Sequence, residues 1–193
     1  MKLLHIDSSA LGANSVSREL TAAIVARWQD NVPGLKVIYR DLDNNPLPHL
    51  TGPVLAKADP AVAEAGEQVL QEFLEADVLV IGAPMYNFSV PSTLKAWIDR
   101  VAVSGRTFRY TEHGPEGLAG GKKIIVASTR GSIHGDGAPS DFQEPYLRYV
   151  FGFLGVTDIE FVRAEGIGYG PQQRADAISG ALAAIPEPLR QAA

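Results

Sequence analysis

Three loops of the sequence carry residue types that would bind a phosphorylated cofactor. The first, DSSALGANSVS (residues 7–17), leads into a predicted helix. Backbone N–H groups at the start of a helix, together with serine hydroxyls, form a cradle for an anion. The loop contains neither a G-x-G-x-x-G fingerprint nor a P-loop lysine, so a terminal monophosphate suits it better than a triphosphate with magnesium. The alternative is that Ser15 only caps the helix.

The second loop, GAPMYNFSVP (residues 82–91), displays aromatic, thioether and amide side chains between two prolines. A flat heteroaromatic ring needs apolar walls and amide groups for its polar edge, and the side chains of Met85, Tyr86, Asn87 and Phe88 supply both. The alternative is that the apolar side chains are satellite core and that Asn87 forms a turn.

The third loop, TRGSIHGDG (residues 129–137), contains glycines that allow a ligand to approach the backbone closely. Thr129, Arg130 and the N–H groups that follow would place positive potential beside a ring that becomes anionic on reduction. A solvated position in the loop is the alternative for Arg130. His134 is a candidate for a role on the substrate side, with a turn or surface position as its alternative.

The elements that must position these loops are five β-rich runs that alternate with helix-length segments. Leu20, Ile24 and Trp28 are spaced by four and predict one apolar stripe on the first helix. The pattern predicts a single α/β domain over residues 1–193. The predicted strands are residues 2–6, 36–41, 78–82, 123–129 and 159–164, and the predicted helices are residues 15–31, 60–76, 92–103, 140–154 and 172–184.

Strands separated by helices imply right-handed crossovers and a parallel, doubly wound sheet, with helices on both faces and the strand order 2-1-3-4-5. Ligands bind beyond the carboxyl ends of such strands, so the three loops are expected to meet at one edge. Their chemistries suit a phosphate, a ring and a ring edge, which are the parts of FMN. One segment breaks the rhythm: RTFRYTEHGPEGLAG (residues 106–120) predicts a hairpin-like excursion before the fourth strand.

Composition excludes several classes of chemistry. The chain of 193 residues has no cysteine, which excludes disulfides, thiolate nucleophiles and the common structural zinc sites. Redox chemistry would therefore need a bound cofactor, and no metal site is expected. A net charge of −5 argues against nucleic acid as a partner. No run resembles a signal peptide or a membrane span, so we expect a cytoplasmic protein.

The sequence resembles the FMN-dependent NADH-azoreductases, which are also described as NAD(P)H:quinone oxidoreductases. The resemblance extends from residue 1 to about residue 180. The motifs that carry it are APMYNF (residues 83–88), TFRYTE (residues 107–112) and GPEGL (residues 114–118), together with Ser9, SVS (residues 15–17), RG (residues 130–131) and AEGI (residues 164–167).

The resemblance implies a flavodoxin-like fold and a homodimer with active sites at the interface. It also implies a ping-pong cycle, in which NADH reduces tightly but non-covalently bound FMN and a quinone or azo compound then takes the electrons. No protein side chain need be catalytic, because the flavin carries the chemistry. Carried over by position, the phosphate would be held by Ser9, Ser15, Val16 and Ser17, the isoalloxazine would be lined by Met85, Tyr86, Asn87 and Phe88, and its pyrimidine edge would meet Thr129, Arg130, Gly131 and Ser132.

Aromatic walls for the substrate are expected from Tyr110 and Phe153, and the hairpin at residues 107–117 is expected to cover the flavin of the partner subunit. A proton for the product would come from water, Tyr86, Tyr110 or His134. Two departures from the family pattern are Ser132, where relatives often have a second glycine, and a short segment at residues 50–60. The first would change redox tuning or acceptor choice, and the second the rim of the pocket.

Two other functions fit a sheet of this kind. An electron-carrier flavodoxin also binds FMN, but such carriers are typically far more acidic and need no hairpin that covers a substrate. A phosphorelay receiver needs an acidic cluster at the strand ends, and here Asp7 stands alone while the third strand ends in glycine. The sequence leaves open the natural acceptor and the choice of NADH over NADPH.

Overall fold

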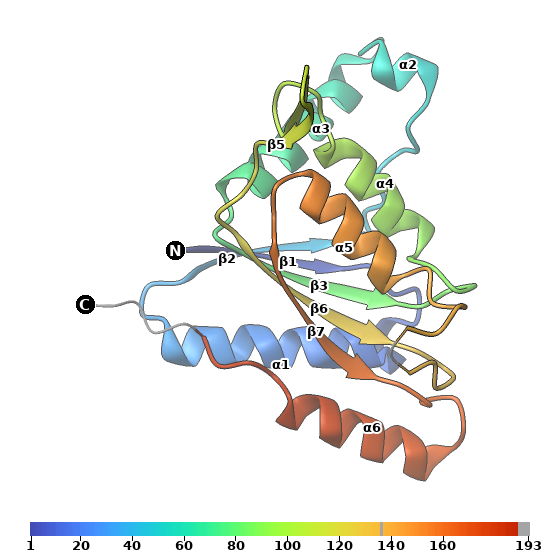
Figure 1. Ribbon diagram of the computed structural model, residues 1–193. Coiled ribbons are helices and arrows are strands. Elements are labelled where there is room, and N and C mark those ends of the chain that lie inside the picture. Colours follow the sequence, from blue (N-terminus) through green and yellow to red (C-terminus); the bar gives the residue numbers. More distant parts are fainter. Residues whose placement is uncertain (136, 189–193) are drawn as a thin grey trace.

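The computed structural model describes residues 1–135 and 137–188, and it is built on a parallel sheet with the strand order β2-β1-β3-β6-β7 (Figure 1). In chain order this is 2-1-3-4-5, so the predicted flavodoxin-like topology is confirmed. The central strands β3 and β6 are buried at every position because helices cover both faces of the sheet. The strands are β1 (Lys2–Asp7), β2 (Lys36–Asp41), β3 (Val78–Pro84), β6 (Lys123–Thr129) and β7 (Asp158–Ala164).

Two helices lie on one face of the sheet and three on the other (Figure 1). On the first face, the predicted stripe of Leu20, Ile24 and Trp28 is buried against the sheet. Within the described residues, no helix is both long and apolar enough to cross a bilayer. The first face carries α1 (Val16–Asn31) and α6 (Pro171–Ala183), and the second carries α3 (Pro60–Glu75), α4 (Ser92–Val101) and α5 (Glu144–Phe153).

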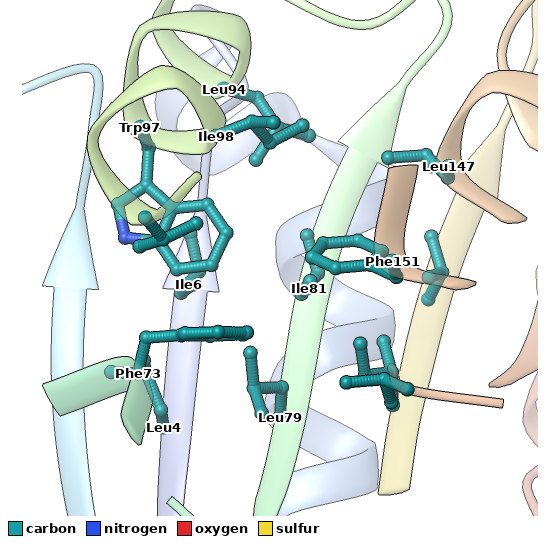
Figure 2. Packing of buried hydrophobic residues seen from close by; sticks show 14 of the residues in the cluster. Leu4, Ile6, Phe73, Leu79, Ile81, Leu94, Trp97, Ile98, Leu147 and Phe151 are labelled. Carbon is teal, nitrogen blue, oxygen red and sulfur yellow. The ribbon is translucent and has the colours of Figure 1, made fainter. Parts of the chain in front are cut away.

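The core on the second face is built around three aromatic rings from three helices (Figure 2). The rings of Phe73 and Trp97 meet edge to face with centroids 5.9 Å apart, and the rings of Trp97 and Phe151 are 6.4 Å apart. They lie over Leu79 and Ile81 of β3, and all five side chains are fully buried. This packing holds α3, α4 and α5 in place, and so fixes the loops at their ends.

The excursion before the fourth sheet strand is a separate antiparallel hairpin of β4 (Phe108–Thr111) and β5 (Gly114–Gly117), as predicted. It lies at the amino edge, where the strands of the main sheet begin (Figure 1). The N–H of Ala119, just after the hairpin, donates to the carbonyl of Leu154 at the end of α5. The hairpin is therefore far from the carboxyl edge, where the strands of its own chain end.

Two helices are shorter than predicted. The fourth helix of the sequence was expected at residues 140–154, but α5 begins at Glu144, because the Asp141 carboxylate accepts the N–H groups of Gln143 and Glu144 and forms a turn instead. The helix expected at residues 92–103 ends at Val101, whose carbonyl accepts a hydrogen bond from the Thr107 hydroxyl.

Two short elements were not predicted: a 3-10 turn, η1 (Gly12–Asn14), in the first loop, and α2 (Gly52–Leu55) in the segment after β2. Each is a single turn, too short to show the apolar periodicity on which helix prediction depends.

Candidate functional site

The loops after β1, β3 and β6 meet at the carboxyl edge of the sheet and enclose a pocket of about 360 Å³. This is the edge at which the topology predicts a ligand. Among the described residues that line the pocket, none is acidic, and Arg174 brings a positive charge. An anionic ligand is therefore favoured. Of the residues predicted to hold FMN, the pocket is lined by Ser9, Ser15, Val16, Met85, Tyr86, Thr129 and Gly131.

The start of α1 forms the phosphate side of this pocket. Ser15 caps the helix, since its Oγ accepts the N–H of Arg18 at 3.3 Å, and it shares a second hydrogen bond with the Ser17 hydroxyl at 3.1 Å. The capping role considered from the sequence is therefore real. It does not compete with anion binding, because a helix start has four N–H groups without intrahelical partners and the cap takes one.

Tyr86 joins the first and second loops. Its hydroxyl shares a hydrogen bond with the Ser9 hydroxyl at 3.2 Å and accepts the N–H of Ala10 at the same distance. Ser9 is fully buried beneath this contact. The Tyr86 side chain also lines a neighbouring pocket of about 480 Å³ together with Asn87 and Tyr146, so it separates two cavities.

An ion-pair network beneath the first loop fixes its shape. Arg18 of α1 donates two hydrogen bonds to the Ser9 carbonyl and forms a two-pronged pair with Asp41 of β2, at 2.7 and 2.8 Å. The Arg18 hydrogen bonds hold the pKa of Asp41 well below its usual range. Burial and the neighbouring Asp7 carboxylate raise the pKa of Tyr39 to about 12, which keeps its hydroxyl as a donor to Asp7.

This network was not predicted, because Arg18 and Asp41 are 23 residues apart and belong to different elements. A signal was present in the position of Asp41, a carboxylate at the end of a predicted strand beside the first.

The second loop is a tight two-residue turn. Tyr86 and Ser89 exchange backbone hydrogen bonds at 3.0 and 3.1 Å, while Asn87 and Phe88 between them have φ values of 49° and 70°. Two left-handed residues in this place form a type I′ turn, which asparagine tolerates and phenylalanine does not favour. The strain at Phe88 presents its ring to solvent, 6.4 Å from the ring of His134. Strained backbone of this kind is concentrated at ligand sites.

We expect Asn87→Ala and Asn87→Gly to weaken FMN binding alike, by about 1–3 kcal/mol, because Asn87 is predicted from the sequence to be the amide partner of the ring's polar edge. Only the alanine should also destabilise the FMN-free protein, because its Cβ opposes the left-handed φ of 49°. Fluorescence titration gives the affinity, and urea unfolding gives the stability. Wild-type affinity in the glycine variant would remove Asn87 from the site.

The sequence suggested that Arg130 either supplies positive potential to the ring or is a solvated loop residue, and its side chain does neither. It is 2% exposed, so it is not a solvated loop residue. Its guanidinium is bound by three carboxylates, those of Asp141 and Glu144 at 2.8 Å and that of Glu165 at 3.0 Å. The charge is thus neutralised and does not supply positive potential to the pocket. Burial alone would raise the pKa of Asp141. Hydrogen bonds from the Glu144 and Gln143 amides, together with the Arg130 charge, outweigh it, and the pKa of Asp141 is lowered.

The backbone of the third loop keeps the features expected of it. The carbonyls of Arg130, Gly131 and Ser132 accept hydrogen bonds from N–H groups at residues 166–168, in the loop after β7. No partner for the N–H groups of Gly131 and Ser132 is found within residues 1–135 and 137–188. Of these two residues, Gly131 lines the acid-free pocket. A free backbone donor there fits the carbonyl-bearing edge of a flavin, and the residues present therefore suit FMN.

Three predicted wall residues do not line the pocket within one chain. Tyr110 and Phe153 pack with Phe108 at the amino edge, where the centroids of Phe108 and Phe153 are 4.6 Å apart, and Tyr110 is 75% exposed. His134 is half-buried, and its Nδ1 lies 3.0 Å from the Ser140 hydroxyl.

Two residues that support the site were missed. Gln143 is fully buried and joins the Ser128 hydroxyl to the Ala83 carbonyl, which ties the ends of β6 and β3 together. Arg174 of α6 lies 3.4 Å from the Asn14 carbonyl, at the rim of the phosphate side. Its only sequence signal was a positive charge in the first turns of the last helix.

Comparison with known proteins gives close matches, of which three follow. A family described as having a flavodoxin-like fold matches residues 1–189. An FMN-dependent NADH:quinone oxidoreductase of Stenotrophomonas maltophilia is 66% identical, over 96% of this chain and 95% of that protein. FMN-dependent NADH:quinone oxidoreductase 1 of Xanthomonas axonopodis pv. citri is also 66% identical, over 97% and 96%.

Solved structures agree with these matches. The crystal structure of an FMN-dependent NADH-azoreductase from Bacillus anthracis in complex with FMN has a TM-score of 0.87 at 25% identity, covering 95% of each chain. An azoreductase from another strain of Bacillus anthracis has a TM-score of 0.85 at 30% identity, with the same coverage.

Proposed function

The chain belongs to the family with the flavodoxin-like fold, and from this premise we infer that it is an FMN-dependent NADH:quinone oxidoreductase that also reduces azo compounds. The observation that carries this conclusion is the acid-free pocket at the carboxyl edge, which joins the start of α1 to Gly131, whose N–H has no partner in the part of the chain that the structure describes. When bound, FMN carries two electrons from NADH to the acceptor.

The protein's part in this reaction is to bind and orient. The start of α1 and Arg174 would hold the phosphate, because they bring positive potential to one end of the pocket. The N–H groups of Gly131 and Ser132 would donate to the pyrimidine edge and stabilise negative charge there. Tyr86, tethered through Ser9, would form one wall of the cofactor pocket.

A homodimer completes this site. The hairpin at residues 108–117 lies at the amino edge and carries a ring, that of Tyr110, which is 75% exposed and therefore free to meet another molecule. We place this hairpin over the partner's flavin, where Tyr110 and Phe153 form aromatic walls for NADH and for the acceptor. Stacking there would orient the reacting atoms, which is the main contribution a protein makes to hydride transfer.

Replacing Tyr110 by alanine should raise the KM for quinone about tenfold, the loss expected when an aromatic contact worth about 1.4 kcal/mol is removed. FMN affinity and the free energy of unfolding should stay near wild type, because the side chain is exposed. Tyr110→Phe serves as the matched control: it keeps the ring, and it should keep the KM as well. Wild-type kinetics in the alanine variant would show that the hairpin does not reach the substrate.

Steady-state kinetics test the function as a whole. With the FMN-loaded protein, double-reciprocal plots of NADH against a quinone should give parallel lines, as a ping-pong cycle requires. An azo dye should compete with the quinone as an alternative acceptor. A protein that binds FMN but passes electrons from NADH to neither acceptor would have to be an electron carrier.

We further propose that residues 1–193 form a single domain and that the protein lies in the cytoplasm, where NADH is available.

A further inference from the structure

A further cavity, distinct from the two lined by Tyr86, lies away from the carboxyl edge, between α2, α3 and α4. This α2–α4 groove has a volume of about 460 Å³. Its lining has an aliphatic part, in which Leu50 and Leu55 are 42% and 69% exposed, and a charged part made of Lys57, Glu67, Asp99, Arg100 and Arg106. The segment at residues 50–60, which the sequence suggested for the rim of the cofactor pocket, lines this groove instead, and none of its residues lines the pocket at the carboxyl edge of the same chain. The aliphatic side chains that matter below are those of Leu50, Val54, Leu55, Leu70 and Val103.

Arg100, in the last turn of α4, lies at the base of the groove and is 8% exposed. Its Nη2 donates to the Pro48 carbonyl at 2.8 Å, and its Nε has no hydrogen-bond partner. No carboxylate within the described parts of the chain forms an ion pair with its guanidinium. The other deeply buried arginine, Arg130, has three such partners. A buried cation without an acid is costly, and proteins rarely keep one unless something else offsets its charge.

The acids nearest to the groove are already paired with other cations. Glu67 lies 3.0 Å from Arg106, and Asp99 lies 2.6 Å from Lys95. Lys57, which also lines the groove, adds a further positive charge. Among the described residues, Arg100 therefore has no acid of its own, and it lies in a groove that also has an aliphatic wall.

Gly66 keeps the space beside the guanidinium open. It lies in the interior of α3, where glycine costs about 1 kcal/mol relative to alanine. A Cβ at this position would stand 3.5 Å from Arg100 Nη1. The absence of a side chain here gives a small molecule in the groove access to the Nη1 end of Arg100.

We propose that the α2–α4 groove binds an organic monocarboxylate, whose carboxylate pairs with Arg100 and whose apolar tail lies along Leu50, Val54 and Leu70. Charge complementarity selects the head group, because Arg100 has free donors and no acid, and guanidinium binds carboxylates in a two-pronged geometry. The aliphatic walls select a tail rather than a small inorganic anion. This site is independent of the proposed oxidoreductase activity.

Hexanoate and 1-hexanol form a matched pair of probes, since they share a tail and differ in charge. Each is titrated into the full-length protein as purified, with binding followed by isothermal calorimetry and by backbone amide shifts at residues 57, 66 and 100. Hexanoate should bind saturably, at one molecule per chain and at least tenfold more tightly than 1-hexanol. Equal affinity for the two probes would overturn the proposal.

Variants separate the site from the fold. Arg100→Met should remove the preference for hexanoate, while Arg106→Met, at the paired and exposed rim, should keep it. Gly66→Leu fills the space beside Nη1 without removing the charge, so it should abolish binding even if the Arg100 variant fails to fold. The proposal would be wrong if hexanoate still bound the Gly66→Leu variant. It would also be wrong if hexanoate dissociated an oligomer, because the groove would then hold a second copy of the chain.

Discussion

Replacing Arg130 by methionine is expected to lower the free energy of unfolding by about 3–5 kcal/mol, the usual cost of removing one partner from a buried ion pair. The side chain is 2% exposed and neutralises Asp141, Glu144 and Glu165 together. FMN affinity should fall at least tenfold as well, because the same carboxylates anchor the third loop: Glu165 accepts the N–H of His134. Urea unfolding of the FMN-free protein and FMN titration measure the two effects.

The pH dependence of this variant follows from the pKa of Asp141, which is lowered in the native wild-type protein. The wild-type stabilisation is present above the unfolded pKa of about 4 and is lost as the pH falls through the folded value. In the variant, Asp141 is left buried without Arg130, so its folded pKa rises. The free-energy cost of burying its unpaired charge disappears when the carboxyl group takes up a proton in acid. The difference in free energy of unfolding between wild type and Arg130→Met should therefore be smaller below pH 4 than at pH 7.

The matched control is Arg163→Met, which removes a cation from the rim of the same cluster. Its side chain is 39% exposed, and Glu144 keeps Arg130 as a partner, so we expect a cost of about 1 kcal/mol or less. If Arg130→Met and Arg163→Met lowered the free energy of unfolding equally, the burial of Arg130 would not be the cause of the loss in Arg130→Met.

Arg18→Gln should have the second largest effect, at least a tenfold loss of FMN affinity with a loss of stability of about 2–3 kcal/mol. Arg18 holds the Ser9 carbonyl and so fixes the loop that forms the phosphate side of the pocket. Because the loss acts through the phosphate, the affinity for riboflavin, which lacks one, should change much less. Equal losses for FMN and riboflavin would contradict this positioning role.

Arg27→Gln on the same helix is the control for Arg18. Arg27 pairs with the exposed Glu187 and donates to the Ile185 carbonyl, at the far end of α1, so its replacement should not alter FMN affinity.

For Arg18→Gln, the low pKa of Asp41 sets the pH range over which stability is lost. Stabilisation by the pair is complete above the unfolded pKa of about 4 and is lost only in stronger acid, so the gap between wild type and Arg18→Gln should be constant from pH 5 to pH 8.

The parts of this fold that could be predicted from sequence are those that depend on local pattern. Apolar runs as continuous as VLVIG and KIIVAST are typical of strands buried on both faces, and their alternation with helices leaves few topologies. The placement of three loops at one edge follows from that topology alone.

The parts that could not be predicted depend on contacts between distant residues. The carboxylates that bury Arg130 come from positions 11, 14 and 35 residues further along the chain, and the Tyr86 hydroxyl meets a serine 77 residues away. The left-handed turn at Asn87 and Phe88 lacks the glycine that usually announces one. In the sequence, Arg100 resembles any other charged residue of an amphipathic helix, because its burial depends on how α4 packs against α3.

The most direct test of the enzyme's function is an anaerobic visible spectrum of the FMN-loaded protein, recorded before and after one equivalent of NADH and again after a quinone. We predict that NADH bleaches the flavin band rapidly and that the quinone restores it in full, which separates the two half-reactions of the cycle. A yellow protein that NADH leaves unbleached, or a protein that takes up no FMN, would contradict the assignment of this chain as an FMN-dependent NADH:quinone oxidoreductase.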